Sequence, residues 1–287
     1  MSELLTSIEL IFLPLVVVLS LMIGSFLNVV IYRLPLMMER AWRKEAAEYL
    51  DQVLGDDEKT PMTLSVPRSA CPHCQHSIRW YENIPLFSYL LILKGRCSSC
   101  AKPISLRYPL VELLTASVGG VVAYHFGFSL TAVAALLFSY ALIALLYIDA
   151  DHQLLPDSIT LPLIWLGLLV NWAGGFVSLD AALWGAVIGY LSLWSVYWLF
   201  KLLTGKEGMG YGDFKLLAAI GAWAGIQVLP GVILISSLLG VVFAVGQSIV
   251  GKRDLQSAMP FGPFLAIAGW IMLIWGGQIN SWYLSLL

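Results

Sequence analysis

The sequence contains little charge. Only 12% of its 287 residues are Asp, Glu, Lys or Arg, whereas 59% are apolar. A typical soluble domain has about 25% charged residues, so this composition excludes both a soluble and a disordered protein. The net charge of −2 provides no basic surface for a polyanion, so nucleic acid is not an expected partner. Four cysteines in 287 residues are too few for a disulfide scaffold.

Long apolar runs take the place of the missing charge. A helix needs about 20 apolar residues to cross the hydrocarbon core of a bilayer. Eight segments are expected to cross it, although one carries Glu112 and another is short and carries Lys215. We therefore predict an all-α polytopic membrane protein with about eight transmembrane helices. The eight segments are residues 10–32, 108–126, 128–148, 161–177, 181–200, 214–226, 228–250 and 261–287.

The basic residues indicate the orientation. If the eight segments cross in alternation, all 16 Lys and Arg residues fall on one side of the membrane, with 11 of them between Arg33 and Arg107. Basic residues mark the cytoplasmic side, so both termini are expected in the periplasm. Three parts follow: a first transmembrane helix at 1–34, a cytosolic insert at 35–107 and a seven-helix membrane domain at 108–287. Within the insert, helical spacing of apolar residues predicts an amphipathic helix at 37–54.

The four cysteines form two C-x-x-C pairs in the insert. Cys71 and Cys74 are separated from Cys97 and Cys100 by 22 residues. Two such pairs are typical of a tetrahedral zinc site, and four thiolates leave no position for a substrate, which predicts a structural role. Two disulfides are the alternative, although the reducing cytosol disfavours them. A module of this size has too small a core to fold alone, and the metal would supply the missing stability.

Two acidic residues lie at the cytoplasmic ends of different expected spans. Asp149 follows an uncharged run, and Asp213 ends a glycine-rich stretch that includes Gly210 and Gly212. Ionisable residues at membrane depth are usually functional. Two carboxylates brought together can share one proton, as in aspartic proteases, where one activates water and the other donates to the carbonyl oxygen.

The glycines support the same interpretation. They allow the backbone to turn and to approach another segment closely. The expected span after them, 214–226, is only 13 residues, so it can begin below the membrane surface with Asp213 near its N-terminus. The other nearby acids, Asp151, Asp157 and Glu207, are by default ordinary solvated loop residues, and Asp157 is a candidate helix cap.

These motifs together resemble the type IV prepilin peptidases over nearly the whole chain. The most specific of them is the G-x-G-D pattern that ends at Asp213. The stretches that carry the resemblance are GSFLNVVIYRLP at 24–35, the C-x-x-C pairs, ENIP at 82–85, RYPLVE at 107–112, IDAD at 148–151, LPD at 155–157 and GMGYGDFK at 208–215.

The resemblance implies a bacterial inner-membrane enzyme with two activities. It would remove the basic leader of prepilins and pseudopilins on the cytoplasmic side, with Asp149 and Asp213 as the catalytic aspartates. It would then methylate the new N-terminal amine with S-adenosylmethionine as methyl donor. The resemblance associates methyl transfer with the insert around Glu82 and Gly95; no pattern in that stretch by itself indicates a methyl-donor site.

Two other function classes fit parts of the sequence. Intramembrane acids and broken helices also serve proton- or ion-coupled transporters, although we find no inverted repeat between the halves of the chain. A scaffold subunit with zinc as its docking module is the second alternative, and it leaves the two aspartates unexplained.

Overall fold

The computed structural model describes residues 2–51, 62–249 and 259–285. Within them the structure is helical, and its only β-pairing consists of two isolated bridges, Ala70 with Ser77 and Arg96 with Pro103. The chain divides into two compact units, residues 1–132 and 133–287, which are described separately.

The first unit is built on two packed helices, α1 (Ser2–Tyr49) and α3 (Arg107–Phe126). Gly24 permits their close approach, because a Cβ there would lie 2.8 Å from the Cα of Glu112. The side chain of Asn28 also donates a hydrogen bond to the carbonyl oxygen of Tyr108, near the start of α3. The two helices therefore meet through residues of the 24–35 and 107–112 motifs.

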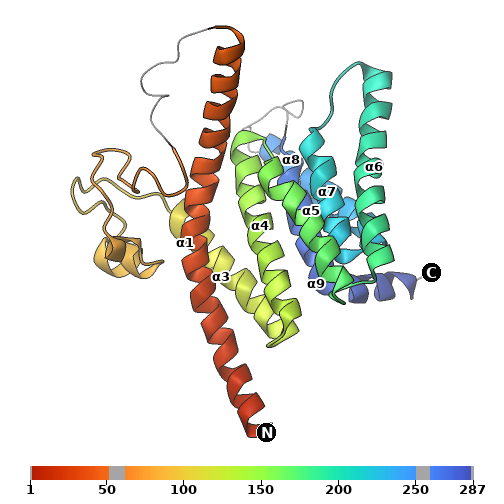
Figure 1. Cartoon of the computed structure of the whole chain (residues 1–287), viewed down its shortest axis with the longest axis horizontal. Coiled ribbons are helices and arrows are strands. Elements are labelled where there is room, and N and C mark those ends of the chain that lie inside the picture. The colour runs from red at the N-terminus through yellow and green to blue at the C-terminus, as the bar shows by residue number, and fades with distance from the viewer. Residues whose placement is uncertain (1, 52–61, 250–258, 286–287) are drawn as a thin grey trace. The chain divides into compact units, whose positions relative to one another are not determined.

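One difference from the sequence-based expectation lies in α1, which Figure 1 shows as a single long helix. It continues through Pro35 to Tyr49, so the predicted amphipathic helix is a continuation of the first span rather than a separate element. A proline removes one hydrogen bond but leaves the residues on both sides able to remain helical. Residues 52–54 of the predicted helix lie outside the described residues.

A loop-rich segment between the two helices carries the cysteines. It contains a short 3-10 turn, η1 (Trp80–Asn83), and a single π-helical turn, η2 (Ser88–Ile92). Its start is held to α1 by Arg33, whose guanidinium donates to the carbonyl oxygens of Thr63 and Leu64. We call residues 62–106 the cysteine module.

The second unit surrounds one short helix with longer ones. The inner helix α7 (Tyr211–Ala224) packs against α5 (Asp157–Trp172), α6 (Leu179–Thr204) and α9 (Gly262–Leu284). Figure 1 shows α7 between α5 and α6. The unit is completed by most of α4 (Leu130–His152), a 3-10 turn, η3 (Ile226–Val228), and α8 (Leu229–Ile249).

Small residues explain how α7 becomes enclosed. Gly185 of α6 and Gly221 of α7 each face the other's backbone so closely that a Cβ on either would overlap the opposite carbonyl oxygen. On the α5 side, the indole of Trp223 fits over Gly167 and donates to the carbonyl oxygen of Leu163. Glycines bring the backbones together, and the large ring fills the remaining space.

All eight predicted apolar segments contain a helix, but their lengths differ. Six helices within the described residues are long and apolar enough to cross a membrane. The other two are α5 and α7, with 16 and 14 residues. The all-helical membrane fold is therefore confirmed, whereas a count of eight spans is not.

Candidate functional site

The two predicted catalytic aspartates lie in the second unit and are both buried. Asp149 is in the last turn of α4 and is 5% exposed, and Asp213 is in the first turn of α7 and is 7% exposed. The carboxylate of Asp149 is close enough for its charge to act on Asp213. Packing thus brings together two acids that are 64 positions apart in the sequence.

Asp213 is held by the turn that precedes it. Gly210 is the N-cap residue of α7, and its backbone hydrogen-bonds the Asp213 carboxylate three residues later. An acidic side chain at the third helical position can in this way accept the backbone N–H of the N-cap residue, which has no partner inside the helix. The G-x-G-D motif therefore starts a helix and fixes its aspartate in one local structure.

The two supporting glycines differ in their surroundings. A Cβ on Gly212 would lie 2.7 Å from the Cβ of Leu155, in the segment that links α4 to α5. A Cβ on Gly210 would meet nothing nearer than the Gly212 nitrogen at 4.0 Å. Gly212 is therefore required for a close approach, whereas the space around Gly210 does not itself require glycine.

Asp149 is held by a helix that the sequence analysis did not connect to it. The backbone N–H of Gly262, the first residue of α9, donates to Asp149 Oδ2 over 3.0 Å. The first N–H groups of a helix have no intrahelical acceptor, so a carboxylate is well placed there. A Cβ on Gly262 would lie only 2.6 Å from the same oxygen. The one sequence feature that could have pointed to this contact is the glycine between Phe261 and Pro263, at the start of the last apolar run.

The neighbouring acids have ordinary surface roles. Asp157 does not cap α5, because Pro156 occupies the N-cap position and the Asp157 carboxylate pairs with Lys215 at 2.7 Å. Glu207 pairs with Lys201 at 2.8 Å, and Asp151 is exposed. In the first unit, the buried Glu112 accepts the backbone N–H of Leu86 over 2.9 Å.

The four cysteines meet in one cluster in the cysteine module. Their sulfur atoms lie within 4.8 Å of one another, and the Cys71–Cys100 and Cys74–Cys97 distances are both 3.9 Å. A tetrahedral zinc site with Zn–S bonds of about 2.3 Å has S–S edges of about 3.8 Å. The four thiols are free, and the measured distances are nearly twice a disulfide bond of about 2.05 Å. The cluster therefore fits a metal and not two disulfides.

Both pairs use the same local fold. In each, the backbone N–H of the first cysteine donates to the residue five positions later, Cys71 to His76 and Cys97 to Lys102. In each, the residue after the second cysteine has a positive φ, 57° at Gln75 and 55° at Ala101. The two tight turns hold their thiols toward one centre, which is how a pair of C-x-x-C motifs forms a closed metal site.

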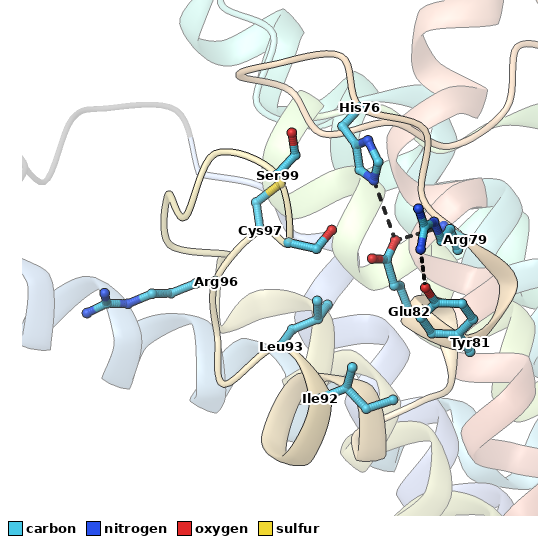
Figure 2. A pocket seen from close by; sticks show the side chains of 10 residues that line it. His76, Arg79, Tyr81, Glu82, Ile92, Leu93, Arg96, Cys97 and Ser99 are labelled. Atoms are coloured by element: carbon cyan, nitrogen blue, oxygen red, sulfur yellow. Dashed lines mark hydrogen bonds and ion pairs between the residues drawn. The ribbon is translucent and has the colours of Figure 1, made fainter.

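A cavity of about 490 Å³ lies beside the second cysteine turn. Its volume is in the range of small-molecule sites. Figure 2 shows His76, Arg79 and Glu82 together on one wall, with Ile92 and Leu93 on another. The Arg79 backbone N–H donates to Glu82 over 2.9 Å, and this bond is the main reason that the pKa of Glu82 is lowered. Glu82 is thus an acidic, hydrogen-bonded wall residue.

Gly95, the second residue associated with methyl transfer, does not line this cavity. It has a φ of +72°, and a Cβ there would lie 3.2 Å from the hydroxyl oxygen of Tyr89. The residue shapes the turn that leads to Arg96 and Cys97, both of which do line the cavity. A larger side chain at position 95 would be strained by its backbone as well as by Tyr89.

Comparison with known proteins connects these features. Residues 18–126 match the model of the bacterial peptidase A24 N-terminal domain, and residues 136–245 match the type IV leader peptidase family. The chain belongs to the type IV leader peptidase family. The first match contains the cysteine module, and the second contains both buried aspartates.

Curated relatives of this family cover almost the whole chain. A protein of Stutzerimonas stutzeri is 56% identical, with 99% of this chain and 97% of the relative aligned. A protein of Pseudomonas aeruginosa is 57% identical, with 98% and 96% aligned, and one of Neisseria gonorrhoeae is 51% identical, with 95% and 94% aligned. All three are named prepilin leader peptidase/N-methyltransferase. No solved structure matches the chain.

Proposed function

We propose that this protein is an intramembrane aspartic endopeptidase that removes the leader of type IV prepilins and pseudopilins and then methylates the new N-terminal amine. The observation that carries the proposal is the pair of buried carboxylates, Asp149 and Asp213, held by the starts of two different helices. The names of the full-length relatives supply the substrate class and the second activity. The comparisons give no support to a transporter.

Hydrolysis follows from two carboxylates that share one proton. The ionised aspartate accepts a proton from water as the water attacks the scissile carbonyl carbon, and the protonated one donates to the carbonyl oxygen. Collapse of the tetrahedral intermediate breaks the C–N bond, and the proton taken from water passes to the leaving amine. The Gly262 and Gly210 backbones hold the two carboxylates for these transfers.

The substrate is a hydrophobic helix that reaches the site from the bilayer. A peptide bond inside a helix is engaged in backbone hydrogen bonds, so the helix must unwind at the scissile bond before water can attack. Asp213 lies at the start of a helix of only 14 residues, about 21 Å long, so the reaction can occur below the level of the membrane surface. The scissile bond would then reach the two aspartates without complete extraction of the substrate from the membrane.

Methyl transfer is proposed at the cavity of the cysteine module. S-adenosylmethionine would supply an electrophilic methyl group on a positively charged sulfur. The protein must hold the neutral N-terminal amine in line with that methyl group and accept the proton that the amine loses. Glu82 places a negative charge on the cavity wall, close to His76. Gly95 would contribute indirectly, by positioning the neighbouring wall residues.

The four-cysteine cluster is proposed to hold one structural zinc ion. Its sulfur geometry fits tetrahedral thiolate ligation, and no ligand position remains for a substrate. The metal would fix the two turns that frame the cavity wall at Cys97 and Ser98. Zinc would therefore support methyl transfer without taking part in it.

The remaining proposals concern location. The bacterial relatives and the six apolar helices support a multi-pass inner-membrane protein. The distribution of basic residues supports a cytosolic insert at 35–107, between a first transmembrane helix at 1–34 and a membrane domain at 108–287, with both termini periplasmic. The two aspartates would lie toward the cytosolic side.

A reconstituted assay with mass spectrometry tests both activities. The purified protein is incubated with a full-length prepilin, with and without S-adenosylmethionine. We expect leader removal under both conditions and a mass increase of one methyl group on the mature N-terminus only when the donor is present. An uncleaved prepilin, with the protein shown to be folded and helical, would refute the peptidase assignment.

A further inference from the structure

The cysteine module exposes an unusual amount of apolar surface on one short turn. Leu90 and Leu91 are 63% and 62% exposed, and Phe87 and Ile92 are 52% and 43% exposed. These four side chains lie within residues 87–92, which we call the apolar turn. A water-soluble surface rarely gathers large apolar side chains in this way, and such a cluster marks an interaction surface.

The apolar turn has a second face that belongs to the module. The buried Ser88 hydroxyl donates to the carbonyl oxygen of Glu82, and the Tyr89 hydroxyl donates to the carbonyl oxygen of Ile104. The module therefore holds the turn through Ser88 and Tyr89, while the side chains of Phe87, Leu90 and Leu91 remain exposed. This amphipathic arrangement is typical of elements that lie in a membrane interface.

A hydrogen bond joins the start of the turn to a helix that is long and apolar enough to cross a membrane. Glu112 of α3 accepts the backbone N–H of Leu86, which directly precedes the turn. Glu112 is five residues beyond Arg107, where α3 begins, so the bond lies about 7.5 Å along the helix axis. At the same level α3 exposes Leu110 and Leu113, as a helix does toward lipid. The turn thus begins beside the body of a membrane helix.

Basic residues follow the apolar turn at once. Lys94 and Arg96 are both exposed, and the positive φ of Lys94, 47°, turns the chain away from the direction of the preceding residues. Lys and Arg next to a buried apolar segment match the anionic headgroup region of a cytoplasmic leaflet. The sequence of apolar and then basic side chains is thus complementary to the layers of a bilayer surface.

We propose that the apolar turn is inserted into the cytoplasmic interface of the bilayer and anchors the cysteine module there. Phe87, Leu90 and Leu91 contact acyl chains, and Lys94 and Arg96 contact lipid phosphates. At the end of the turn, Ile92 and the next residue, Leu93, line the cavity (Figure 2). One consequence rests on the proposed function. The anchor holds the cavity at the membrane surface, where a cleaved pilin that is still embedded in the membrane presents its new N-terminus.

The anchor itself is tested by photochemical crosslinking of the full-length protein. Leu91 is replaced by p-benzoylphenylalanine, and the protein is illuminated in nanodiscs of phosphatidylethanolamine and phosphatidylglycerol. We expect an adduct with the mass of one phospholipid. Ser99, which is exposed on the second cysteine turn, is the matched control position and should give no lipid adduct. Crosslinks from position 91 only to residues 133–287, or no lipid adduct, would overturn the proposal whatever the enzyme's activity.

The functional consequence is tested with the double variant Leu90→Gln, Leu91→Gln, whose side chains lie outside the cavity lining. We expect unchanged leader cleavage and metal content. Methylation of a membrane-embedded cleaved pilin should fall about tenfold, because its amine and the cavity are no longer held at the same surface. A soluble peptide with the same N-terminus should be methylated at the wild-type rate. Equal losses on both substrates, or no loss on either, would contradict the anchor's role. A wild-type protein that methylates neither substrate would instead contradict the proposed function.

Discussion

The cysteine module and helix α7 represent opposite ways of fixing functional side chains. Between residues 62 and 106 only Cys71 and Ser88 are buried. In α7, 11 of 14 residues are buried. The module has almost no core, so its form depends on the four-thiol cluster and a few hydrogen bonds, whereas packed helices hold α7. We therefore expect metal removal to damage the cysteine module. The region around α7 should instead be damaged by a side chain added at a glycine where helices meet closely.

The largest effect is expected at the two aspartates. Asp149→Asn and Asp213→Asn should each reduce leader cleavage by about 10²–10⁴-fold, because the amide keeps the shape of the side chain but cannot exchange the proton. Both proteins should still accumulate in membranes. Asp157→Asn is the control, since this carboxylate is exposed and pairs with Lys215. Near-normal cleavage by either of the first two variants would remove the catalytic assignment.

Metal loss should separate the two regions. Purified protein is expected to contain one zinc per chain, and Cys71→Ser should abolish metal binding and methylation because the module unfolds. Cleavage should fall much less, since Asp149 and Asp213 lie in the other unit. Metal analysis, proteolysis of residues 62–106 and both activity assays measure this. Protein that is fully methylating but free of zinc would contradict the structural role.

A side chain added next to Asp149 should have the reverse effect, with cleavage reduced and methylation unchanged. Gly262→Ala should lower kcat for cleavage by about 10²-fold with a smaller change in KM, because the new Cβ displaces the Asp149 carboxylate. Methylation of pre-cleaved substrate and zinc content should not change. Gly277→Ala in the same helix is the matched control, because a Cβ there meets nothing within 4 Å. Equal cleavage by the two variants would show that Gly262 does not position Asp149.

Smaller changes within the module should distinguish its cavity from its turn. Glu82→Ala and Gly95→Val should both leave cleavage largely intact and reduce methylation of pre-cleaved substrate. Glu82→Ala should retain zinc. If Gly95 serves only the turn that leads to Cys97, Gly95→Val should lose zinc together with methylation, because valine is strained at a φ of +72°. Mass spectrometry of the mature N-terminus, read beside zinc content, separates the two causes, and full methylation by both variants would exclude the insert from methyl transfer.

Much of the fold could be predicted from local patterns. Hydropathy located the apolar segments because a membrane span must be apolar along its length. The first span and the amphipathic helix at 37–54 were predicted as separate elements, whereas α1 continues from one into the other through Pro35, because one proline removes only one hydrogen bond. The Asp157 cap was also wrong, because its partner Lys215 lies 58 positions away in the sequence and is brought near only by packing of α5 against α7.

The sequence by itself determined which side chains are available: the two C-x-x-C pairs, an acid at the end of an apolar run and an acid after three spaced glycines. Each of these patterns lies within a few residues, where local geometry is fixed by residue type. Only the tertiary structure decided that Gly262 holds Asp149, that Glu112 holds the chain before the apolar turn, and that Gly212 rather than Gly210 is needed for close packing. Such contacts join residues far apart in the chain. They depend on how closely whole helices approach one another, which no local pattern specifies.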